Sequence, residues 1–255
     1  MTMFQIESLC KSFPTSKGSI GVIEDLSLNL VEGEFLCIVG PSGCGKTTLL
    51  KCMCGLEKPT SGTLLIKGSP PNPQIQKFGV IFQEDSLLPW RTVLGNVMFA
   101  QEICRAHSEE TAKKYISLVG LQGFEVYYPY QISGGMKKRV AIARALAVDP
   151  DIIIMDEPFA DLDAQTRWIL QKELLSIWST LKKTVIFITH NVEEAVFLGQ
   201  RIAILTKRPA KLKALINVDL PYPRSSLSTP FISYREKIIG LLADEIPSIQ
   251  QEAEK

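Results

Sequence analysis

The sequence feature that most constrains the fold is a glycine-rich loop between a short apolar run and a helix. The apolar run, Phe35 to Val39, is typical of a buried strand, and Thr47 to Cys54 has the pattern of a helix closed by Gly55. The loop fits the pattern G-x-x-x-x-G-K-[ST], in which backbone N–H groups and the helix start cradle phosphate groups. The residues expected to bind phosphate are Gly40, Pro41, Ser42, Gly43, Cys44, Gly45, Lys46, Thr47 and Thr48.

Two side chains of this loop suit a nucleoside triphosphate with its Mg²⁺. Lys46 places a positive charge against the β- and γ-phosphates, and the hydroxyl of Thr47 can ligate Mg²⁺. A loop of this kind also occurs in kinases, GTPases and helicases. Other motifs must therefore define the reaction.

A second apolar run ends in two acidic residues. Ile152 to Met155 predicts a buried strand, and Asp156 and Glu157 follow at its carboxyl end, the edge where open α/β sheets bind ligands. Asp156 is suited to hold Mg²⁺ through water. Glu157 is suited to polarise an attacking water, which contributes roughly 10²–10⁴-fold to a rate. An adjacent acid that acts as a base favours hydrolysis over transfer to an acceptor; the alternative is an ordinary strand end.

Strands and helices alternate along most of the chain, which predicts an α/β fold with helices on both faces of a parallel sheet. The further strands are expected at Thr63–Ile66, Gly79–Phe82, Val185–Ile188 and Arg201–Leu205, and the helices from Asp163 onward and near Glu193.

Three segments depart from the alternation. Residues 1–35 have the pattern of short strands broken by a polar loop from Pro14 to Gly21. The stretch from about Ser86 to Gln131 is helical in pattern, and Ser108 is placed to cap one of its helices. The tail after Lys207 is rich in proline and predicts one modest helix, from about Ser233 to Asp244.

A serine and two glycines start another expected helix. Ser133 can cap it, and Gly134 and Gly135 expose backbone N–H groups at its positive end, which makes a second anion site. Here the sequence resembles the ATP-binding-cassette ATPases, whose signature is usually Leu-Ser-Gly-Gly-Gln. This chain departs from it with Ile132 and Met136, and Met136 lacks the hydrogen-bonding groups of glutamine.

The resemblance spans nearly the whole chain and implies further roles. Gln83 matches the glutamine that senses Mg²⁺ and the attacking water, and His190 matches the histidine that contacts the γ-phosphate. Asp163 matches an acid at the dimer interface, although Asp161 stands where a small apolar residue is more usual. Phe13 is the candidate for stacking on adenine, and an ordinary core phenylalanine is the alternative.

The resemblance also implies the organisation of the chain. A single ATP-binding domain, residues 1–255, is expected to have a P-loop NTPase core formed by residues 1–85 and 146–206, with an antiparallel β subdomain at its N-terminus. Residues 86–145 would be the inserted helical signature subdomain, and residues 207–255 a short C-terminal extension. Two copies would form a head-to-tail dimer that encloses two ATP molecules, each between one P-loop and the partner's signature.

Three segments resemble one branch of bacterial importers. They are the runs 83–93, 158–167 and 189–195. This branch imports nitrate, sulfonates, taurine and related molecules, including pyrimidine precursors of thiamine. The resemblance implies two membrane-spanning permease subunits and an extracytoplasmic binding protein as partners. The alternatives are an exporter motor, a soluble cassette ATPase of DNA repair or translation, and a P-loop kinase, for which the signature and His190 would have no use.

The run Leu87, Leu88, Pro89 and Trp90 is expected to meet a permease helix beside Gln83. An exposed tryptophan beside apolar residues is a plausible anchor for such a contact. The alternative is that Trp90 packs inside the helical subdomain.

Composition argues against two other classes of protein. Lys and Arg number 28 and Asp and Glu 27, so the net charge of +1 lacks the basic excess of a nucleic-acid binder. The N-terminus lacks a signal peptide, and no run of about 18 apolar residues is present. The six cysteines lack metal or redox spacing and are expected to be free thiols. The expected location is therefore the cytoplasmic face of the inner membrane, as a peripheral protein.

Overall fold

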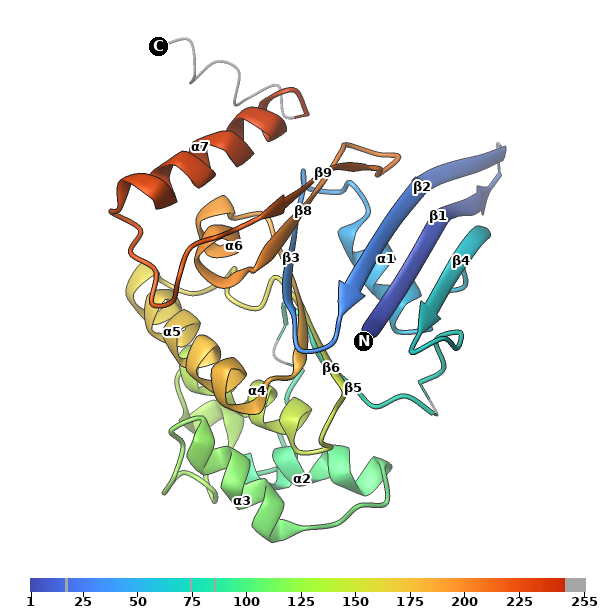
Figure 1. Cartoon of the computed structure of the whole chain (residues 1–255). Coiled ribbons are helices and arrows are strands. Elements are labelled where there is room, and N and C mark those ends of the chain that lie inside the picture. Colours follow the sequence, from blue (N-terminus) through green and yellow to red (C-terminus); the bar gives the residue numbers. More distant parts are fainter. Residues whose placement is uncertain (17, 74, 85, 246–255) are drawn as a thin grey trace. The chain divides into compact units, whose positions relative to one another are not determined.

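The computed structural model describes residues 1–16, 18–73, 75–84 and 86–245. The chain divides into two compact units, and each is described here by itself. The first unit comprises Met1–Pro73 and Ile186–Lys255, and the second comprises Gln74–Val185. Figure 1 shows the elements in chain order.

An antiparallel sheet of three strands opens the first unit. Its strands are β1 (Thr2–Thr15), β2 (Gly18–Val31) and β4 (Ser61–Ile66), in the order β2-β1-β4. Gln5 of the central strand lies opposite Asn29 on one side and Leu65 on the other. The expected antiparallel N-terminal sheet is therefore confirmed (Figure 1).

The prediction of a polar loop from Pro14 to Gly21 is wrong, because β1 ends at Thr15 and β2 begins at Gly18. Pro14 pairs with Ser19 and Thr15 with Gly18, so the strands extend almost to the turn. The side chains there are exposed, and β pairing at this end does not depend on an apolar pattern. Polar composition alone therefore did not indicate a loop.

The buried sheet of the first unit has the strand order β7-β3-β8-β9. Its strands are β3 (Phe35–Val39), β7 (Thr184–Thr189, of which the first unit holds residues 186–189), β8 (Arg201–Leu205) and β9 (Leu212–Asn217). Every residue of β3 is buried, as expected for an inner strand covered on both faces. β8 is parallel to β3, whereas β9 is antiparallel to β8.

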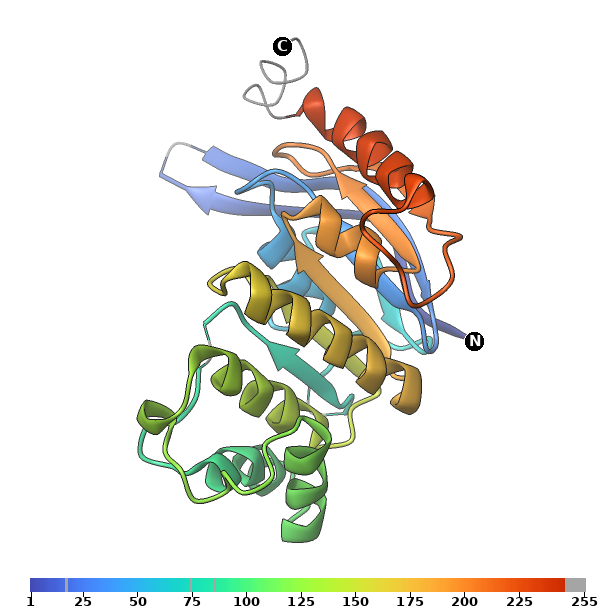
Figure 2. The ribbon, with the colours of Figure 1, turned by 90° about the vertical axis from the view of Figure 1, so that its left-hand side faces the viewer.

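The described residues of the first unit form three helices. They are α1 (Lys46–Met53), α6 (Val192–Leu198) and α7 (Thr229–Ala243). α6 packs against β3 and α7, and Figure 2 shows α6 and α7 side by side. α7 begins four residues before the expected Ser233. Pro230 lies in its first turn, where the missing N–H of proline has no intrahelical partner to lose.

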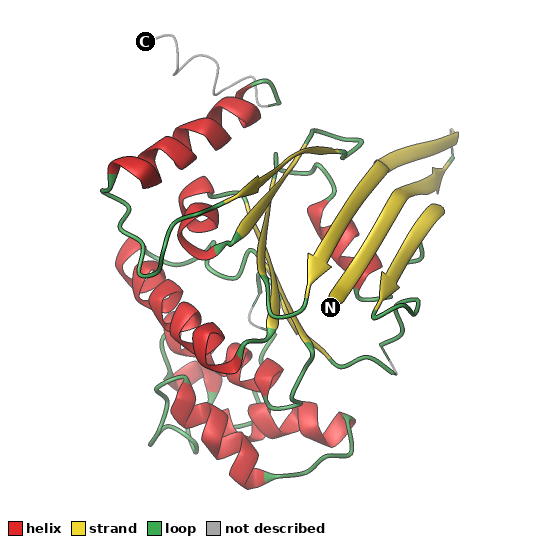
Figure 3. Ribbon diagram, in the orientation of Figure 1, coloured by secondary structure: helices red, strands yellow, loops and turns green. Residues whose placement is uncertain are grey.

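The second unit contains two parallel strands and most of the helices (Figure 3). The strands are β5 (Phe78–Ile81) and β6 (Ile152–Asp156), which pair from Phe78 opposite Ile152 to Ile81 opposite Met155. The helices are α2 (Val93–Ile103), α3 (Glu109–Leu118), the short 3₁₀ helix η1 (Pro129–Gln131), α4 (Gly134–Leu146) and α5 (Ala164–Leu181). α2, α3 and α4 pack against one another, so the helical pattern after Ser86 is confirmed.

Candidate nucleotide-binding site

The glycine-rich loop joins β3 to α1, as the sequence predicts. The N-cap of α1 is Gly45, and no side chain caps the helix, so a bound anion can take that role. The backbone of Gly43 has φ 71° and that of Gly45 φ 125°, values that L side chains rarely adopt. These turns give the loop the curl that a phosphate cradle requires.

Close packing also restricts Gly45 to glycine. A Cβ atom at this position would lie 2.9 Å from Cγ1 of Val22 and 3.1 Å from the carbonyl oxygen of Val22. The backbone of the loop therefore lies directly against β2. This arrangement fits a loop that binds its ligand through main-chain N–H groups.

The Lys46 side chain folds back over the loop. Its Nζ donates to the carbonyl oxygen of Gly40 at 2.9 Å and to that of Pro41 at 3.1 Å. Lys46 is only 6% exposed, so its charge is held at the loop rather than in bulk water. Burial raises the pKa of the neighbouring Cys44 thiol, although Lys46 acts in the opposite direction. Cys44 is therefore a neutral packing residue of the loop.

The second unit places an amide and two carboxylates at adjacent strand ends. β5 and β6 are parallel, so Gln83, two residues after β5, follows the same edge at which β6 ends in Asp156. Asp156 is 8% exposed. Glu157 has φ 46°, the left-handed region, and a strained residue at a carboxyl-terminal strand edge fits a functional position.

Helix α4 supports the loop after β5 through two basic residues that the sequence did not single out. Lys138 donates from Nζ to the carbonyl oxygen of Gln83, and Arg144 donates from Nη1 to that of Ser86 at 2.7 Å. Lys138 is 4% exposed although it lies in the charged run Lys137–Arg139. Burial is the only feature that distinguishes Lys138 from a solvated surface lysine, and the burial of a residue cannot be read from the sequence motif.

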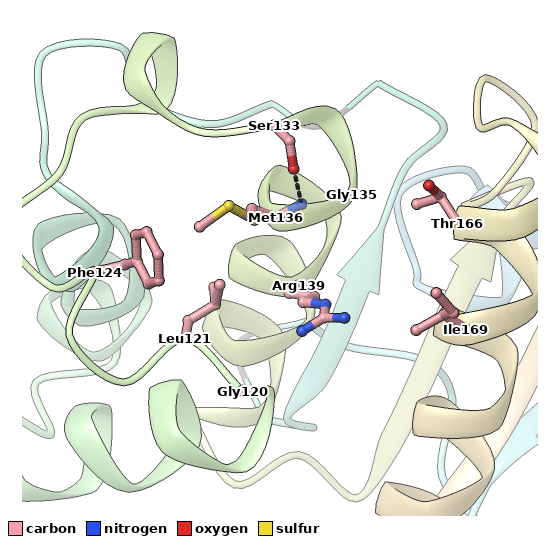
Figure 4. A pocket seen from close by; sticks show the side chains of 9 residues that line it. All are labelled: Gly120, Leu121, Phe124, Ser133, Gly135, Met136, Arg139, Thr166 and Ile169. Carbon is pink, nitrogen blue, oxygen red and sulfur yellow. Dashed lines mark hydrogen bonds between the residues drawn. The ribbon is translucent and has the colours of Figure 1, made fainter.

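Ser133 caps α4, as predicted. Its Oγ accepts from the backbone N–H of Met136 at 3.3 Å. Beside this helix start lies a cavity of about 310 Å³ (Figure 4), lined by Gly120, Leu121, Phe124, Ser133, Gly135, Met136, Arg139, Thr166 and Ile169. The cavity combines a positive helix end with an apolar wall, which suits an anion that carries an organic part.

The side chain of Met136 extends toward Phe124 across this cavity (Figure 4). Gly135 faces α5, and a Cβ atom there would lie 2.8 Å from Cγ2 of Thr166. The Met136 side chain therefore contributes apolar surface where the usual glutamine would offer an amide.

The remaining candidates occupy loops and strand ends. Asp163 caps α5, and the backbone N–H of Thr166 donates to it at 3.0 Å, which lowers the pKa of this carboxyl. His190 is exposed directly after β7. Phe13 is half-buried in β1, with Nζ of Lys11 4.5 Å from its ring centroid, and it lies outside the buried core.

The structure groups these residues by unit. The first unit holds the glycine-rich loop, Phe13 and His190, and the second holds Gln83, Asp156, Glu157, Ser133, Gly134, Gly135 and Asp163. Among the described residues no cluster of three His, Cys, Asp or Glu side chains could hold a metal by itself. Hydroxyl, amide and carboxylate oxygens, such as those of Thr47 in the first unit and of Gln83 and Asp156 in the second, are nevertheless the kind of ligand that Mg²⁺ takes together with phosphate and water.

Trp90 is 71% exposed, so the alternative that it packs inside the helical region is wrong. Asn96 is buried and fixes the preceding segment. Its side chain accepts from the N–H of Leu88 at 2.8 Å and donates to the carbonyl oxygens of Leu88 at 3.1 Å and Arg91 at 3.0 Å. The hydrogen bonds of Asn96 therefore fix the backbone on both sides of the exposed Trp90. Asp85, in the same expected run, lies outside the described residues.

All six cysteines are free thiols, as expected. Among the residues that the structure describes, none of the helices is both long and apolar enough to cross a membrane.

Comparison with known proteins gives consistent matches. The family described as ABC transporter matches residues 23–160. An uncharacterized ABC transporter ATP-binding protein of Methanocaldococcus jannaschii, MJ0412, is 51% identical over 95% of this chain and 92% of its own. The aliphatic sulfonates import ATP-binding protein SsuB of Bacillus cereus is 43% identical over 92% of this chain and 93% of its own.

A solved structure shows the same fold. The dimeric structure of MJ0796, described as a bacterial ABC transporter cassette, has a TM-score of 0.74 and 31% identity, and the match covers 86% of this chain and 100% of that chain. The same cassette has also been solved as a dimer in a post-hydrolysis state bound to ADP and Pi.

Proposed function

We propose that this chain drives the import of a small sulfonate-like molecule. The premise is that the chain belongs to the ABC transporter family and is the ATP-binding, ATP-hydrolysing subunit of a transporter. The observation that carries the ATPase part of this proposal is that one chain contains two helix starts suited to bind an anion, the loop before α1 and the capped start of α4. One γ-phosphate does not need two such sites in one chain. Two copies of the chain supply both sites to each nucleotide.

In this proposal the first unit binds the phosphates of ATP. The backbone N–H groups of residues 42–48 surround the β- and γ-phosphates, and Lys46 leaves the carbonyl oxygens of Gly40 and Pro41 to pair with them. Phe13 stacks on adenine. Thr47, Gln83 and Asp156 would hold Mg²⁺, and the ion would supply positive charge that neutralises the phosphate oxygens.

Hydrolysis then depends on two groups that orient water. Glu157 accepts a proton from the attacking water, and His190 contacts the γ-phosphate. Phosphoryl transfer requires positioning and charge neutralisation more than covalent chemistry. The strained backbone of Glu157 supports this role, because strain persists where the surrounding structure holds a residue in a specific orientation.

The signature completes the site of a second copy. Ser133, Gly134 and Gly135 present a capped helix start to the γ-phosphate bound by the partner's loop, and Asp163 lies at the same interface. The dimeric relative supports this arrangement. Closure of the two copies is the step that moves the attached permeases, and loss of phosphate reopens them.

The exposed Trp90 marks the proposed docking surface for a permease helix. The same unit has an apolar pocket of about 250 Å³ that includes Phe78, Val80, Phe99 and Ile103, and Arg91, the residue after Trp90, lies over the Phe99 ring. Ile103 is 68% exposed, and exposed large apolar side chains are typical of protein contacts. Two permease subunits would hold the dimer at the cytoplasmic face of the inner membrane as a peripheral assembly.

The substrate class is proposed from likeness alone, because the substrate contacts the permease and an extracytoplasmic binding protein. An aliphatic sulfonate such as taurine fits the relatives named for aliphatic sulfonates, and nitrate comes only from the resemblance to the importer branch. A pyrimidine precursor of thiamine is the alternative from the same branch, and an exporter motor is the more distant one. No nucleic acid partner is proposed.

The test is ATP hydrolysis by this chain assembled with its permease in lipid, with candidate binding proteins and ligands added. We expect stimulation only by a binding protein loaded with its ligand, and the ligand that stimulates names the substrate. A rate that does not respond to any binding protein would contradict the importer and favour the exporter.

A further inference from the structure

The C-terminal end of α6 is held by a segment far away in the sequence. Arg224, which follows β9, donates from Nη1 to the carbonyl oxygens of Val196 at 2.6 Å and Gly199 at 2.7 Å. The last carbonyl groups of a helix have no intrahelical partner, so Arg224 satisfies groups that would otherwise need water. The hydroxyl of Tyr222 donates in the same way to the carbonyl oxygen of Leu198 at 2.6 Å.

Arg224 is itself fixed in its orientation. Its Nε donates to the carbonyl oxygen of Leu220 at 3.1 Å and its Nη2 to that of Val218 at 3.2 Å. The guanidinium lies over the Tyr222 ring, 4.2 Å from the centroid, and the residue is 7% exposed. The five-donor fork of arginine is what allows one side chain to join four carbonyl groups, which a lysine cannot reproduce.

The N-terminal end of α6 is held as firmly. Asn191 accepts from the N–H groups of Glu193 at 2.9 Å and Glu194 at 3.3 Å. The Thr189 hydroxyl donates to the buried Glu194 carboxylate at 2.6 Å and accepts from the N–H of Asn191 at 3.0 Å. His190 lies between these two fixed residues, at the junction of β7 and α6.

We infer that Arg224 is a positioning residue, which fixes α6 from its far end and thereby sets the orientation of His190. α6 has only seven residues, so a displacement at Gly199 is transmitted to the helix start. The C-terminal extension therefore contributes to the ATP site, although it contains none of the proposed contacts with ATP. The expected effect of Arg224 on the rate of hydrolysis rests on the proposed role of His190. The claim that Arg224 orients His190 does not.

The structural part can be tested by NMR of the histidine side chains of the full chain. The chain has only two histidines, so His107, exposed in the second unit, serves as an internal reference. In Arg224→Gln we expect the imidazole signals of His190 to shift or broaden while those of His107 stay in place. Unchanged His190 signals in a folded Arg224→Gln chain would overturn the inference.

Two further variants guard against simple loss of folding. Tyr222→Phe removes the hydroxyl that donates to Leu198, and we expect a smaller change of the His190 signals in the same direction. Lys213→Gln removes the contacts of Lys213 with Asp244 and Glu245 at the C-terminal end of α7, neither of which involves a residue of α6, and we expect no change. An equal change in Lys213→Gln would show a general loosening of the extension and contradict a specific role of Arg224.

A double-mutant cycle of ATP hydrolysis tests the effect on the rate. Arg224→Gln should lower kcat by up to roughly 100-fold with little change in KM, as expected for a misplaced group. The double variant with His190→Ala should be no slower than His190→Ala alone. Losses that multiply would contradict positioning through His190. If His190→Ala hydrolyses ATP normally, the proposed role of His190 fails, and the NMR result still decides the structural inference.

Discussion

At the scale of single residues, Gly45 shows how backbone geometry limits the phosphate loop. Its φ is 125°, and an added methyl group would lie 2.9 Å from Val22. Gly45→Ala should lose nucleotide binding and lower the free energy of unfolding by about 1–3 kcal/mol. Binding of a fluorescent ATP analogue and urea unfolding measure the two effects.

Gly68 is the matched control for this substitution. It also has a positive φ, 81°, but nothing lies within 4 Å of an added Cβ atom, and it is outside the phosphate loop. Gly68→Ala should therefore cost less and leave ATP binding intact. If the two variants lost the same free energy of unfolding, the close packing of Gly45 against Val22 would not contribute to the cost of the substitution.

A buried thiol predicts a pH dependence of stability. Burial raises the pKa of Cys54 to about 12, whereas an unfolded cysteine titrates near 8.5. The stabilisation that this shift provides is present below about pH 8.5 and is lost as the pH rises toward 12, by up to about 1.4 kcal/mol per pH unit. Urea unfolding between about pH 8 and 10 measures it. A Cys54→Ala chain with the same slope would contradict the assignment.

The residues of the site differ in how far sequence predicts them. Lys46 and Asp156 follow from motifs, because phosphate binding and a strand end dictate their types. The strain at Glu157 and the burial of Lys138 do not follow, since both depend on neighbours distant in the sequence. The same holds for Arg224, which lies in the proline-rich tail and belongs to no motif.

At the scale of elements, two helices with the same kind of N-cap allow the effect of capping to be measured apart from the effect of ligand binding. Ser108 caps α3 and Ser133 caps α4, and each accepts from an N–H three residues ahead. Replacement of either serine by alanine should cost about 1 kcal/mol of stability. Only Ser133→Ala should slow ATP hydrolysis, as measured at saturating ATP. If both variants changed the rate of ATP hydrolysis equally, Ser133 would act only as a helix cap, and its proposed role in binding the partner's nucleotide would be contradicted.

Sequence patterns identified elements that are deeply buried or capped and missed those at edges. The sequence does not predict β9, because it is an edge strand in which only Ile216 is buried, so its apolar alternation is weak. The sequence predicts the start of α7 near Ser233, but the helix begins at Thr229, because a proline that breaks a helix interior is favoured in the first turn. The buried run of β6 and the caps of α4 and α5 left no such ambiguity.

At the scale of the whole molecule, we propose that one chain carries parts of two nucleotide sites and needs a second chain to complete each of them. The sequence predicts this from the order of its motifs and its likeness to a family, not from composition. The substrate does not follow from the sequence, because in the proposed importer the groups that recognise it belong to the permease and the binding protein.

The most direct test of this account is the mass in solution of the Glu157→Gln chain with and without Mg²⁺ and ATP. Without ATP we expect one chain of 28.3 kDa. With ATP we expect twice that mass, because hydrolysis, which reopens the dimer, is blocked. The added change Ser133→Arg should restore the single-chain mass while ATP remains bound. A Glu157→Gln chain that stays single with ATP bound, or that hydrolyses ATP at the normal rate, would contradict a site completed by a partner.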